Sequence, residues 1–178
     1  TFWAHTKKKN KLLDKCLDSI CKFLYSRCDK IFVSSHGFKK LFFKLIKREV
    51  CFIPQWAEDD FKYIRRCKKS KKKINIFFAG NLGYAQNIDI LKKLFLKFRN
   101  NDIANFYIFS SGRKIKDLSF FLKKNQIQNV KLNKFLSIKD YFNASKKCDL
   151  FLMTIRNKKV FNHTMPARLS TALAMGLP

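Results

Sequence analysis

The sequence predicts an α/β fold with a Rossmann-type parallel sheet. Short apolar runs of strand length alternate with segments whose apolar residues recur at helical spacing. The run 74–79 is apolar at all but one position, which is typical of a strand buried on both faces of a parallel sheet. Strand–helix repeats of these lengths imply parallel strands with right-handed crossovers. Apolar residues make up 47% of the 178 residues, enough for a substantial core.

The first part of the chain, residues 1–54, already alternates in this way. Apolar residues between 11 and 25 follow spacings of three and one, which mark one face of a helix. The elements expected here are a helix at 11–25, a strand at 31–34, a turn at 35–37, a second helix at 38–46 and a strand at 50–53. Residues 55–73 break the pattern and include a basic stretch without periodicity, so we expect a linker between two domains.

Residues 74–178 repeat the strand–helix unit several times. The expected strands lie at 74–79, 106–109, 130–132 and 150–153, with helices at 88–98, 115–122 and 138–142 between them. A loop at 154–163 leads to a last helix, with Pro166 at its first position, Thr164 as a cap and Gly176 and Pro178 as the stop. We expect one domain plus part of another, as a fragment truncated at both ends.

The net charge of +27 raises the question of a nucleic-acid partner. The lysines are spread along the whole chain and accompany abundant Phe, Ile and Asn, and these four residue types share A/T-rich codons. Genome composition therefore accounts for the excess without any partner. We interpret the densest basic runs, 7–9 and 68–73, as solvated loops. Nucleic-acid binding by a basic module is kept as an alternative function. An anionic membrane surface is at least as good a candidate partner for this charge as a nucleic acid.

Cysteine and histidine usage argues against a zinc site. The six cysteines form no Cys-x-x-Cys pair, and the chain has three histidines and no Cys/His cluster. We expect no metal and no cofactor, and we expect reduced, buried thiols in a cytoplasmic protein at Cys16, Cys21, Cys28, Cys51, Cys67 and Cys148. These residues contain no signal peptide and no apolar run of membrane-spanning length.

Two elements suited to phosphate binding follow strands of the second part. In doubly wound sheets, ligands bind beyond the carboxyl ends of the strands, where the strand order reverses. In the common order this point lies between the first and fourth strands, which end at Gly80–Gly83 and at the loop before Arg168. Glycines allow close backbone approach, and a helix start offers free N–H groups and a favourable dipole. Arg168 in the first turn would add a forked cation.

Each of these features also has a purely structural interpretation. Gly80 and Gly83 fit a tight strand–helix turn, and 164–178 fits an ordinary capped surface helix. Gly112 and Arg113 fit a solvated loop, and His163 fits either a polar ligand contact or an incidental loop position. The glycines do not form a Gly-x-Gly-x-x-Gly fingerprint, and no acidic residue ends the second strand, which argues against NAD.

From about Tyr25 onward the chain resembles the retaining nucleotide-sugar glycosyltransferases of family 4, which have the GT-B fold. Four stretches carry the resemblance in order: 25–38, 54–58, 78–86 and 164–178. Pro54-Gln-Trp-Ala-Glu58 is similar to the family's interdomain Pro-Asn-Trp-Ala-Glu, and the last stretch to Thr-x-Pro-Ser-Lys followed by Tyr-Leu-Ala-x-Gly-x-Pro. The likeness is strongest to bacterial enzymes that add N-acetylated amino sugars, such as fucosamine, to surface polysaccharides, lipopolysaccharide among them.

The resemblance implies a domain plan and an activity. Residues 1–54 would end the N-terminal acceptor domain, 55–73 would link the domains, and 74–178 would form most of the nucleotide-sugar-binding domain. The activity would be transfer of a sugar, with retention, from a nucleotide diphosphate donor to a polysaccharide or lipid-linked acceptor. A UDP-sugar is the expected donor, in the cytoplasm or peripherally at the inner face of the plasma membrane. We expect the fragment alone to be inactive, and a degenerate, non-catalytic transferase stays open as another alternative.

The resemblance also assigns site positions, with no catalytic residue among them. The 80–83 loop would lie under the donor diphosphate, but Asn81 and Gln86 stand where the wider family has an Arg and a Lys. Arg168, supported by Arg113, is the candidate to replace these cations. His163 and Thr171 stand where the wider family has two glutamates, and Lys134 and Phe135 match the loop that holds the base. The donor-site candidates are Gly80, Asn81, Leu82, Gly83, Gln86, Gly112, Arg113, Lys134, Phe135, His163, Thr164, Pro166, Ala167, Arg168 and Thr171.

Overall fold

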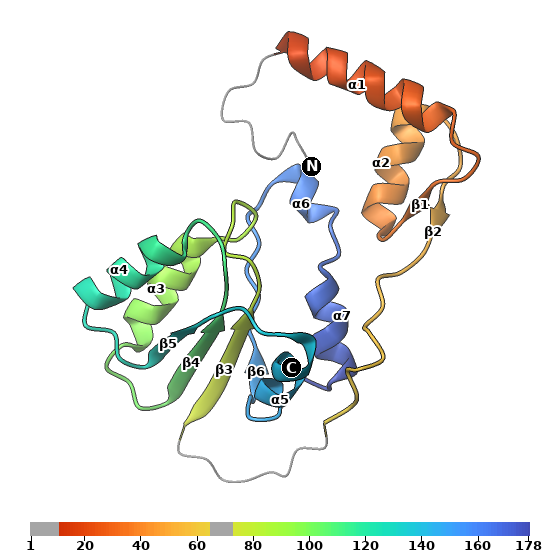
Figure 1. Ribbon diagram of the computed structural model, residues 1–178. Coiled ribbons are helices and arrows are strands. Elements are labelled where there is room, and N and C mark those ends of the chain that lie inside the picture. Colours follow the sequence, from red (N-terminus) through yellow and green to blue (C-terminus); the bar gives the residue numbers. More distant parts are fainter. Residues whose placement is uncertain (1–10, 65–72) are drawn as a thin grey trace. The chain divides into compact units, whose positions relative to one another are not determined.

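The computed structural model describes residues 11–64 and 73–178 (Figure 1). These residues form two compact units. The first comprises the described residues up to Gln55 together with Asn157–Pro166, and the second comprises the described residues of Trp56–Arg156 together with Ala167–Pro178. The division expected from the sequence, at 1–54, 55–73 and 74–178, stays a prediction. The basic run 7–9, most of the run 68–73, and Cys67 lie outside the described residues.

The first unit contains a short parallel strand pair and helices. Its elements are α1 (Lys11–Ser26), β1 (Phe32–Val33), α2 (His36–Ile46), β2 (Cys51–Phe52) and α6 (Lys159–Asn162), with Phe32 paired to Cys51. The helices and strands expected over this part are confirmed, but the predicted turn at 35–37 is wrong. The Ser35 hydroxyl accepts a hydrogen bond from the Phe38 N–H at 3.1 Å, so Ser35 caps α2 and the helix begins at His36.

The second unit is a four-stranded parallel sheet with helices. Its elements are β3 (Ile74–Ala79), α3 (Ile88–Phe98), β4 (Ala104–Phe109), α4 (Ile115–Lys124), β5 (Val130–Asn133), α5 (Ile138–Ser145), β6 (Leu150–Phe151) and α7 (Ala167–Ala174). The strand order is β5-β4-β3-β6, and every pair is parallel. The Rossmann-type sheet is confirmed, and its order reverses between β3 and β6, where the sequence analysis expected a ligand crevice.

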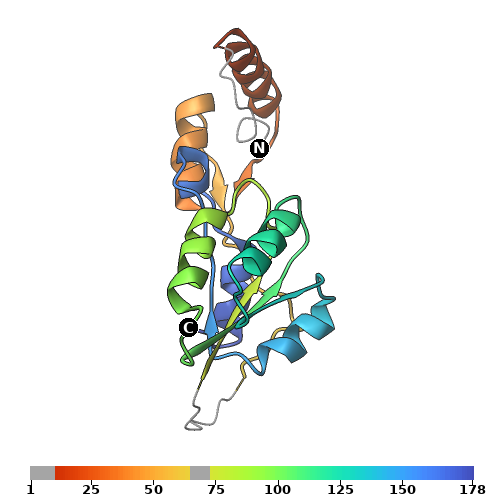
Figure 2. The same cartoon turned by 90° about the vertical axis from the view of Figure 1, so that its left-hand side faces the viewer.

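Both faces of this sheet are covered, because β3 is apolar on both sides. Successive strand residues point to opposite faces. Phe78 packs with α3 and α4 residues such as Leu91 and Leu118. Phe77 packs with Tyr141 of α5 and Ala172 of α7. Figures 1 and 2 show α3 and α4 lying together along the sheet. The two layers hold β3 at the centre, so the residues that follow Ala79 have a fixed position.

The last helix begins one residue later than predicted. α7 starts at Ala167, so Pro166 precedes the helix and Arg168 lies in its first turn. Gly176 has φ +65°, a left-handed conformation that suits the residue after a helix. The loop predicted at 154–163 contains the short helix α6. One-residue differences at helix ends are ordinary, because terminal turns depend on local hydrogen bonding rather than on apolar periodicity.

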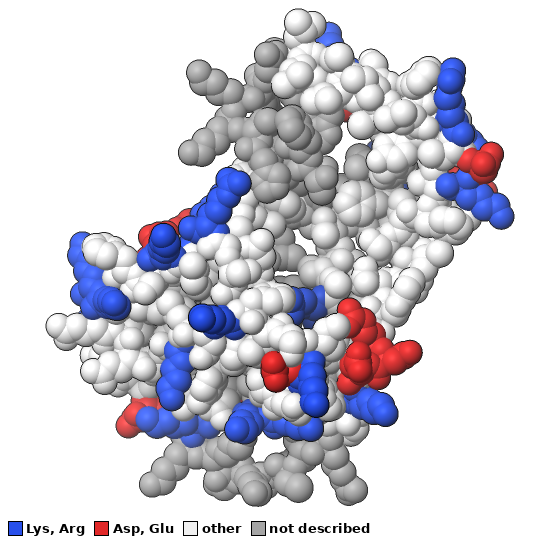
Figure 3. Space-filling view, viewed as in Figure 1, with Lys and Arg blue, Asp and Glu red and all other residues white. Residues whose placement is uncertain are grey.

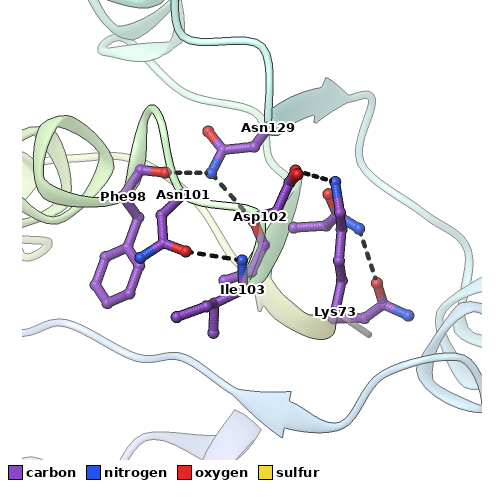
Figure 4. Close-up of polar contacts among 9 residues, drawn as sticks. Lys73, Phe98, Asn101, Asp102, Ile103 and Asn129 are labelled. Carbon is purple, nitrogen blue, oxygen red and sulfur yellow. Dashed lines mark hydrogen bonds and ion pairs between the residues drawn. The ribbon is translucent and has the colours of Figure 1, made fainter. Parts of the chain in front are cut away.

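Polar side chains close the edge of the sheet at which the strands begin, here called the amino edge (Figure 4). The Asn129 side-chain amide donates to the carbonyls of Phe98 at 2.8 Å and Ala104 at 3.1 Å. Lys73 forms an ion pair with Asp102. These contacts tie the end of α3 and the starts of the strands together.

A second group at the amino edge joins β3 to β6. The backbone N–H of Asn75 donates to the Asp149 carboxylate at 2.9 Å, and the Asn75 side chain donates to the Lys147 carbonyl at 3.1 Å. The Asp149 carboxylate therefore supplies the hydrogen-bond acceptor for this N–H group at the start of β3, which would otherwise be unpaired.

The cysteine prediction is partly wrong. The cysteines of the described ranges form no disulfide bond with one another. Cys148 is buried and Cys21 is partly buried, while Cys16, Cys28 and Cys51 are exposed. Their apolar spacing suggested burial, yet they lie on the surface of the first unit. Within residues 11–64 and 73–178, no helix is both long and apolar enough to cross a membrane. In Figure 3, Lys and Arg side chains are scattered over the visible face rather than gathered in a stripe.

Candidate functional site

The glycine loop after β3 is built into the sheet by backbone hydrogen bonds. Gly80 has φ +157°, and its N–H donates to the Phe109 carbonyl at 3.0 Å. The Leu82 N–H donates to the Ser111 carbonyl at 2.9 Å, and the Leu82 side chain is fully buried in the core. The buried Ser110 hydroxyl donates to the Gly80 carbonyl at 2.6 Å and accepts from the Leu82 N–H at 3.1 Å. Leu82 is therefore an anchor of the loop.

These bonds limit what the loop can offer a ligand. The N–H groups of Gly80 and Leu82 donate within the protein, and the Gly83 N–H donates to the Asn81 carbonyl at 2.8 Å. The Asn81 N–H is the one in this loop for which the described part of the chain supplies no acceptor. From the sequence, several backbone N–H groups of this loop could bind a phosphate. In the structure, only the Asn81 N–H is open to one among the described residues of the loop.

Gly112 belongs to the same assembly, because it lies directly under the glycine loop. Its φ is +122°, and a Cβ atom there would lie 3.0 Å from the Leu82 carbonyl oxygen and would collide with the Asn81 side chain. A residue larger than glycine would push the loop away. Its neighbour Arg113 and the predicted base-loop residue Lys134 are both exposed.

Arg168 extends from the first turn of α7 over the glycine loop. A Cβ atom built on Gly80 would lie 3.8 Å from Nε and 3.9 Å from Cδ of Arg168. The two elements that the sequence placed on either side of the strand reversal therefore meet through this side chain. The centre of the guanidinium lies 5.1 Å from the ring centroid of Phe135 and 5.2 Å from that of Tyr141, within cation–π range of both.

A cavity of about 240 Å³ opens beside Arg168. Three sequence-predicted candidates besides Arg168 line it: Phe135, Ala167 and Thr171. The Thr171 hydroxyl donates to the Ala167 carbonyl at 3.3 Å, within the helix. The other lining residues are Glu58, Phe61, Leu136, Ile138 and Tyr141. The cavity thus combines aromatic and apolar walls with one cation, one carboxylate and two hydroxyls, which is the composition of a small-molecule pocket.

Tyr141 contributes an unusual polar group to this cavity. The residue is 3% exposed, and its hydroxyl has no hydrogen-bond partner among the described residues. Burial raises the pKa of this phenol above its ordinary value of 10.0, and the positive charge of Arg168 and the closeness of its side chain to the hydroxyl both oppose that rise. The tyrosine is therefore neutral at physiological pH. Buried hydroxyls normally find a partner, so this one is available to a ligand.

Arg156 holds the segment between the glycine loop and α3. Its N–H donates to the Ala85 carbonyl at 2.9 Å, its Nε donates to the Gln86 carbonyl at 3.3 Å, and its guanidinium lies 5.0 Å from the Tyr84 ring centroid. The Gln86 side-chain oxygen and the Thr154 hydroxyl are buried without a partner in the residues described. Arg156 is thus a second cation near the position of Gln86, where the resemblance implied one.

Three of the predicted residues, His163, Thr164 and Pro166, belong to the first unit. The Ser35 hydroxyl donates to the His163 carbonyl, and the His163 ring packs on α2, 6.3 Å from the Phe38 ring centroid. A Cβ atom on Gly37 would lie 3.0 Å from the His163 Cα, so a glycine is needed for this approach. Within its unit, His163 therefore has a packing role.

Sequence reasoning assigned no role to three residues of the site: Glu58, Tyr141 and Arg156. Glu58 stood in the quoted Pro-Gln-Trp-Ala-Glu stretch, which placed it near the domain link but not in a cavity. Tyr141 was read as a core residue of a helix, which it is, and its unpaired hydroxyl depends on tertiary packing. Arg156 followed a predicted strand, a weak signal in a chain with this many cations.

Comparison with solved structures identifies the fold. The chain is similar to the lipopolysaccharide outer core galactosyltransferase WaaB (TM-score 0.64, 14% identity, 85% of this chain and 42% of that one). It is similar to the pneumococcal O-GlcNAc transferase GtfA, solved with UDP and GlcNAc (TM-score 0.66, 17% identity, 88% and 30%). It is also similar to WaaG, a glycosyltransferase involved in lipopolysaccharide biosynthesis (TM-score 0.64, 14% identity, 84% and 43%).

These neighbours are GT-B glycosyltransferases, so the α/β, GT-B-like fold predicted from the sequence is confirmed. The chain spans less than half the length of each of the three proteins. No protein-family model matches the sequence, and no curated protein matches it. At identities of 14–17% the likeness establishes the fold, and the donor-site roles of individual residues stay predictions.

Proposed function

We propose that this chain carries the donor-binding part of a nucleotide-sugar glycosyltransferase. The observation that carries the proposal is the meeting of Arg168 with the glycine loop, at the point where the strand order reverses between β3 and β6. Ligands of doubly wound sheets bind at that point. The glycosyltransferase neighbours share this fold, and both GtfA and TarM (TM-score 0.60, 10% identity) were solved with UDP.

The diphosphate would lie between the start of α7 and residue Asn81. The guanidinium of Arg168 is a forked cation that suits phosphate oxygens, and the start of α7 adds the positive end of the helix dipole. The Asn81 N–H is the further donor available. Chemically, these groups would stabilise the charge that develops on the departing nucleoside diphosphate, without any change in the protein's own protonation.

The nucleoside would occupy the cavity beside Arg168. Phe61, Leu136 and Ile138 give the cavity apolar walls, and the Tyr141 hydroxyl offers a buried hydrogen-bonding group. Glu58 supplies a carboxylate of the kind that accepts hydrogen bonds from ribose hydroxyls. It thus stands in for the glutamate that the resemblance led us to expect at Thr171.

The finer assignments rest on the resemblance to family 4. They comprise retention of anomeric configuration, a UDP-linked N-acetylated amino sugar as donor, and a glycan or lipid-linked acceptor. The same resemblance supports a cytoplasmic location, with peripheral contact at the inner face of the membrane. The scattered charge on the visible face offers no concentrated basic stripe of the kind that nucleic-acid binding uses.

Isothermal titration calorimetry with UDP tests the proposal. The 178-residue chain should bind UDP with one-to-one stoichiometry at moderate salt, and circular dichroism should confirm folding. Arg168→Ala should weaken binding about 5- to 150-fold, which corresponds to about 1–3 kcal/mol for a charged hydrogen bond. Arg99→Ala is the matched control, because Arg99 follows α3 at the amino edge of the sheet.

Two results would contradict the proposal. One is a folded chain that binds a single-stranded oligonucleotide with steep salt dependence but does not bind UDP. The other is equal UDP affinity in the wild-type, Arg168→Ala and Arg99→Ala proteins, which would remove Arg168 from the site.

A further inference from the structure

Arg168 is flanked by two aromatic rings that differ in burial: Tyr141 is buried and Phe135 is exposed. We propose that Phe135 and Tyr141 are positioning residues that form a clamp on Arg168, holding its guanidinium over Gly80 so that it meets the terminal phosphate of a nucleoside diphosphate. The inference rests on the proposed function and deepens it, because it names side chains that act through Arg168 rather than on the ligand. We call this arrangement the Arg168 clamp.

The geometry of the clamp is set by three contacts. The guanidinium centre lies 5.1 Å from the Phe135 centroid and 5.2 Å from the Tyr141 centroid, and both distances are within the range of favourable cation–π contact. The Arg168 Nε lies 3.8 Å from the position that a Cβ of Gly80 would take. The stem of Arg168 therefore crosses the glycine loop, and its head lies near both rings.

Tyr141 is the fixed side of the clamp. Its ring packs edge-on against Phe61, with centroids 5.4 Å apart, and against Phe77 at 5.3 Å. Phe77 is fully buried at the centre of the sheet. The position of the Tyr141 ring is thus determined by the core, and the α5 helix that carries it is fixed by the Ser137 cap, whose hydroxyl accepts from the Asp140 N–H at 3.2 Å.

Phe135 is the adjustable side. It lies in the loop between β5 and the Ser137 cap and is 51% exposed. An exposed aromatic ring is unfavourable in water, and contact with another group reduces its exposed area. Here the neighbouring group is a guanidinium, which is more weakly hydrated than an ammonium group and is therefore more easily covered by a ring. Resemblance alone had assigned this position to base binding through backbone. That assignment stays a prediction, and the structure adds a contact between the Phe135 ring and Arg168.

The described part of the chain does not neutralise the charge of Arg168. Among the described residues, no carboxylate lies within ion-pair distance of its guanidinium. Arg156, by contrast, donates its Nε to a backbone carbonyl. A long arginine side chain without an anionic partner would sample many rotamers in solvent. Two rings restrict it without consuming its charge, so that the charge stays available to an anionic ligand.

The clamp makes a prediction that a stacking or packing role does not make. If Phe135 acts through Arg168, replacing Phe135 should reduce the gain in affinity that the second phosphate of UDP provides. The affinity for UMP, which lacks that phosphate, should stay the same. The measured quantity is the ratio of the dissociation constants for UMP and UDP. Residues that act as one unit also give non-additive effects, so a double variant should be no worse than Arg168→Ala alone.

The experiment is calorimetric titration of UMP and UDP into the wild-type protein and five variants. Phe135→Leu and Arg168→Ala should each lower the UMP/UDP ratio at least fivefold, and the double variant should match Arg168→Ala. Phe135→Trp, which restores an aromatic face, should recover the wild-type ratio. Phe120→Leu is the matched control, since Phe120 lies on α4 and is 69% exposed, and it should leave the ratio unchanged.

Each contrary result has a distinct meaning. Equal loss of UMP and UDP affinity in Phe135→Leu would overturn the clamp and assign Phe135 to the base. Additive effects in the double variant would overturn it as well. A folded wild-type protein that binds neither nucleotide would overturn the proposed function itself, and the clamp with it.

Discussion

The two edges of the sheet in the second unit differ in how their polar groups are used. At the amino edge, side chains bond to one another and to the backbone. The Asp149 carboxylate accepts from the Asn75 N–H. The Asn129 side chain donates to two carbonyls (Figure 4). At the carboxyl edge, the Tyr141 hydroxyl, the Gln86 side-chain oxygen and the Thr154 hydroxyl are buried without partners in the described ranges. The amino edge has one comparable atom, the Asn129 side-chain oxygen.

We infer from this difference that the amino edge serves the stability of the sheet and that the carboxyl edge serves the proposed ligand site. Buried polar groups without partners cost free energy, and proteins tolerate them where a ligand can satisfy them. The amino edge closes the sheet with all but one of these polar groups paired, the exception being the Asn129 side-chain oxygen. The carboxyl edge keeps several open, together with the positive charge of Arg168. Substitutions at the first edge should therefore affect folding, and those at the second should affect binding.

The largest expected effect on stability at the amino edge comes from Asp149→Ala. This change leaves the Asn75 N–H without its acceptor, and we expect a loss of about 1–3 kcal/mol in the free energy of unfolding. Urea denaturation followed by circular dichroism measures it. Asp149→Asn retains an oxygen acceptor and should lose less. UDP affinity should be unchanged in both variants, and a parallel loss of UDP affinity would contradict the separation of the two edges.

A smaller and opposite effect is expected from Tyr141→Phe at the carboxyl edge. The change removes a buried hydroxyl that has no partner and keeps the ring that contacts Arg168. We expect the free energy of unfolding to rise by about 1 kcal/mol, because the penalty for the unpaired hydroxyl disappears. A fall in stability of similar size would show that the hydroxyl is satisfied in solution.

We also expect the wild-type protein and Tyr141→Phe to differ in how their free energy of unfolding depends on pH. The pKa of Tyr141 is raised in the folded state, so the folded protein holds the phenolic proton more tightly than the unfolded chain does. Stability from this group is complete below the ordinary pKa of 10.0 and is lost as the pH rises through the folded value. The wild-type protein should therefore lose more stability than Tyr141→Phe when the pH is raised above about 10. Equal losses would contradict the burial-driven shift.

Most of the fold could be predicted from local patterns. The spacing of apolar residues located the helices, and the run at 74–79 located the central strand with both ends correct, because burial on both faces leaves a nearly continuous apolar signal. The start of α2 was missed because Ser35 was interpreted as part of a turn rather than as a cap. The sequence alone does not distinguish a turn from a helix cap at this position, because serine is favoured in both.

The site could be predicted only in part. The glycine loop and Arg168 were assigned to one crevice from strand order, and the structure brings them together. The cavity, the clamp and the internal bonding of the loop's N–H groups depend on distances between elements far apart in sequence. Ser110, for example, bonds Gly80 and Leu82 across 30 and 28 residues. No spacing rule anticipates that a loop amide is already used.

The most direct test of the account is a UDP titration of ¹⁵N-labelled protein followed by NMR. If the donor site lies at the carboxyl edge, the largest changes in amide chemical shift should fall at residues 80–83 and 167–169, with Asn81 among them. The amide signals of Asn101, Asp102 and Ile103 at the amino edge should not change. Shifts spread over exposed lysines, or confined to the amino edge, would show that the open polar groups at the carboxyl edge do not form the donor site.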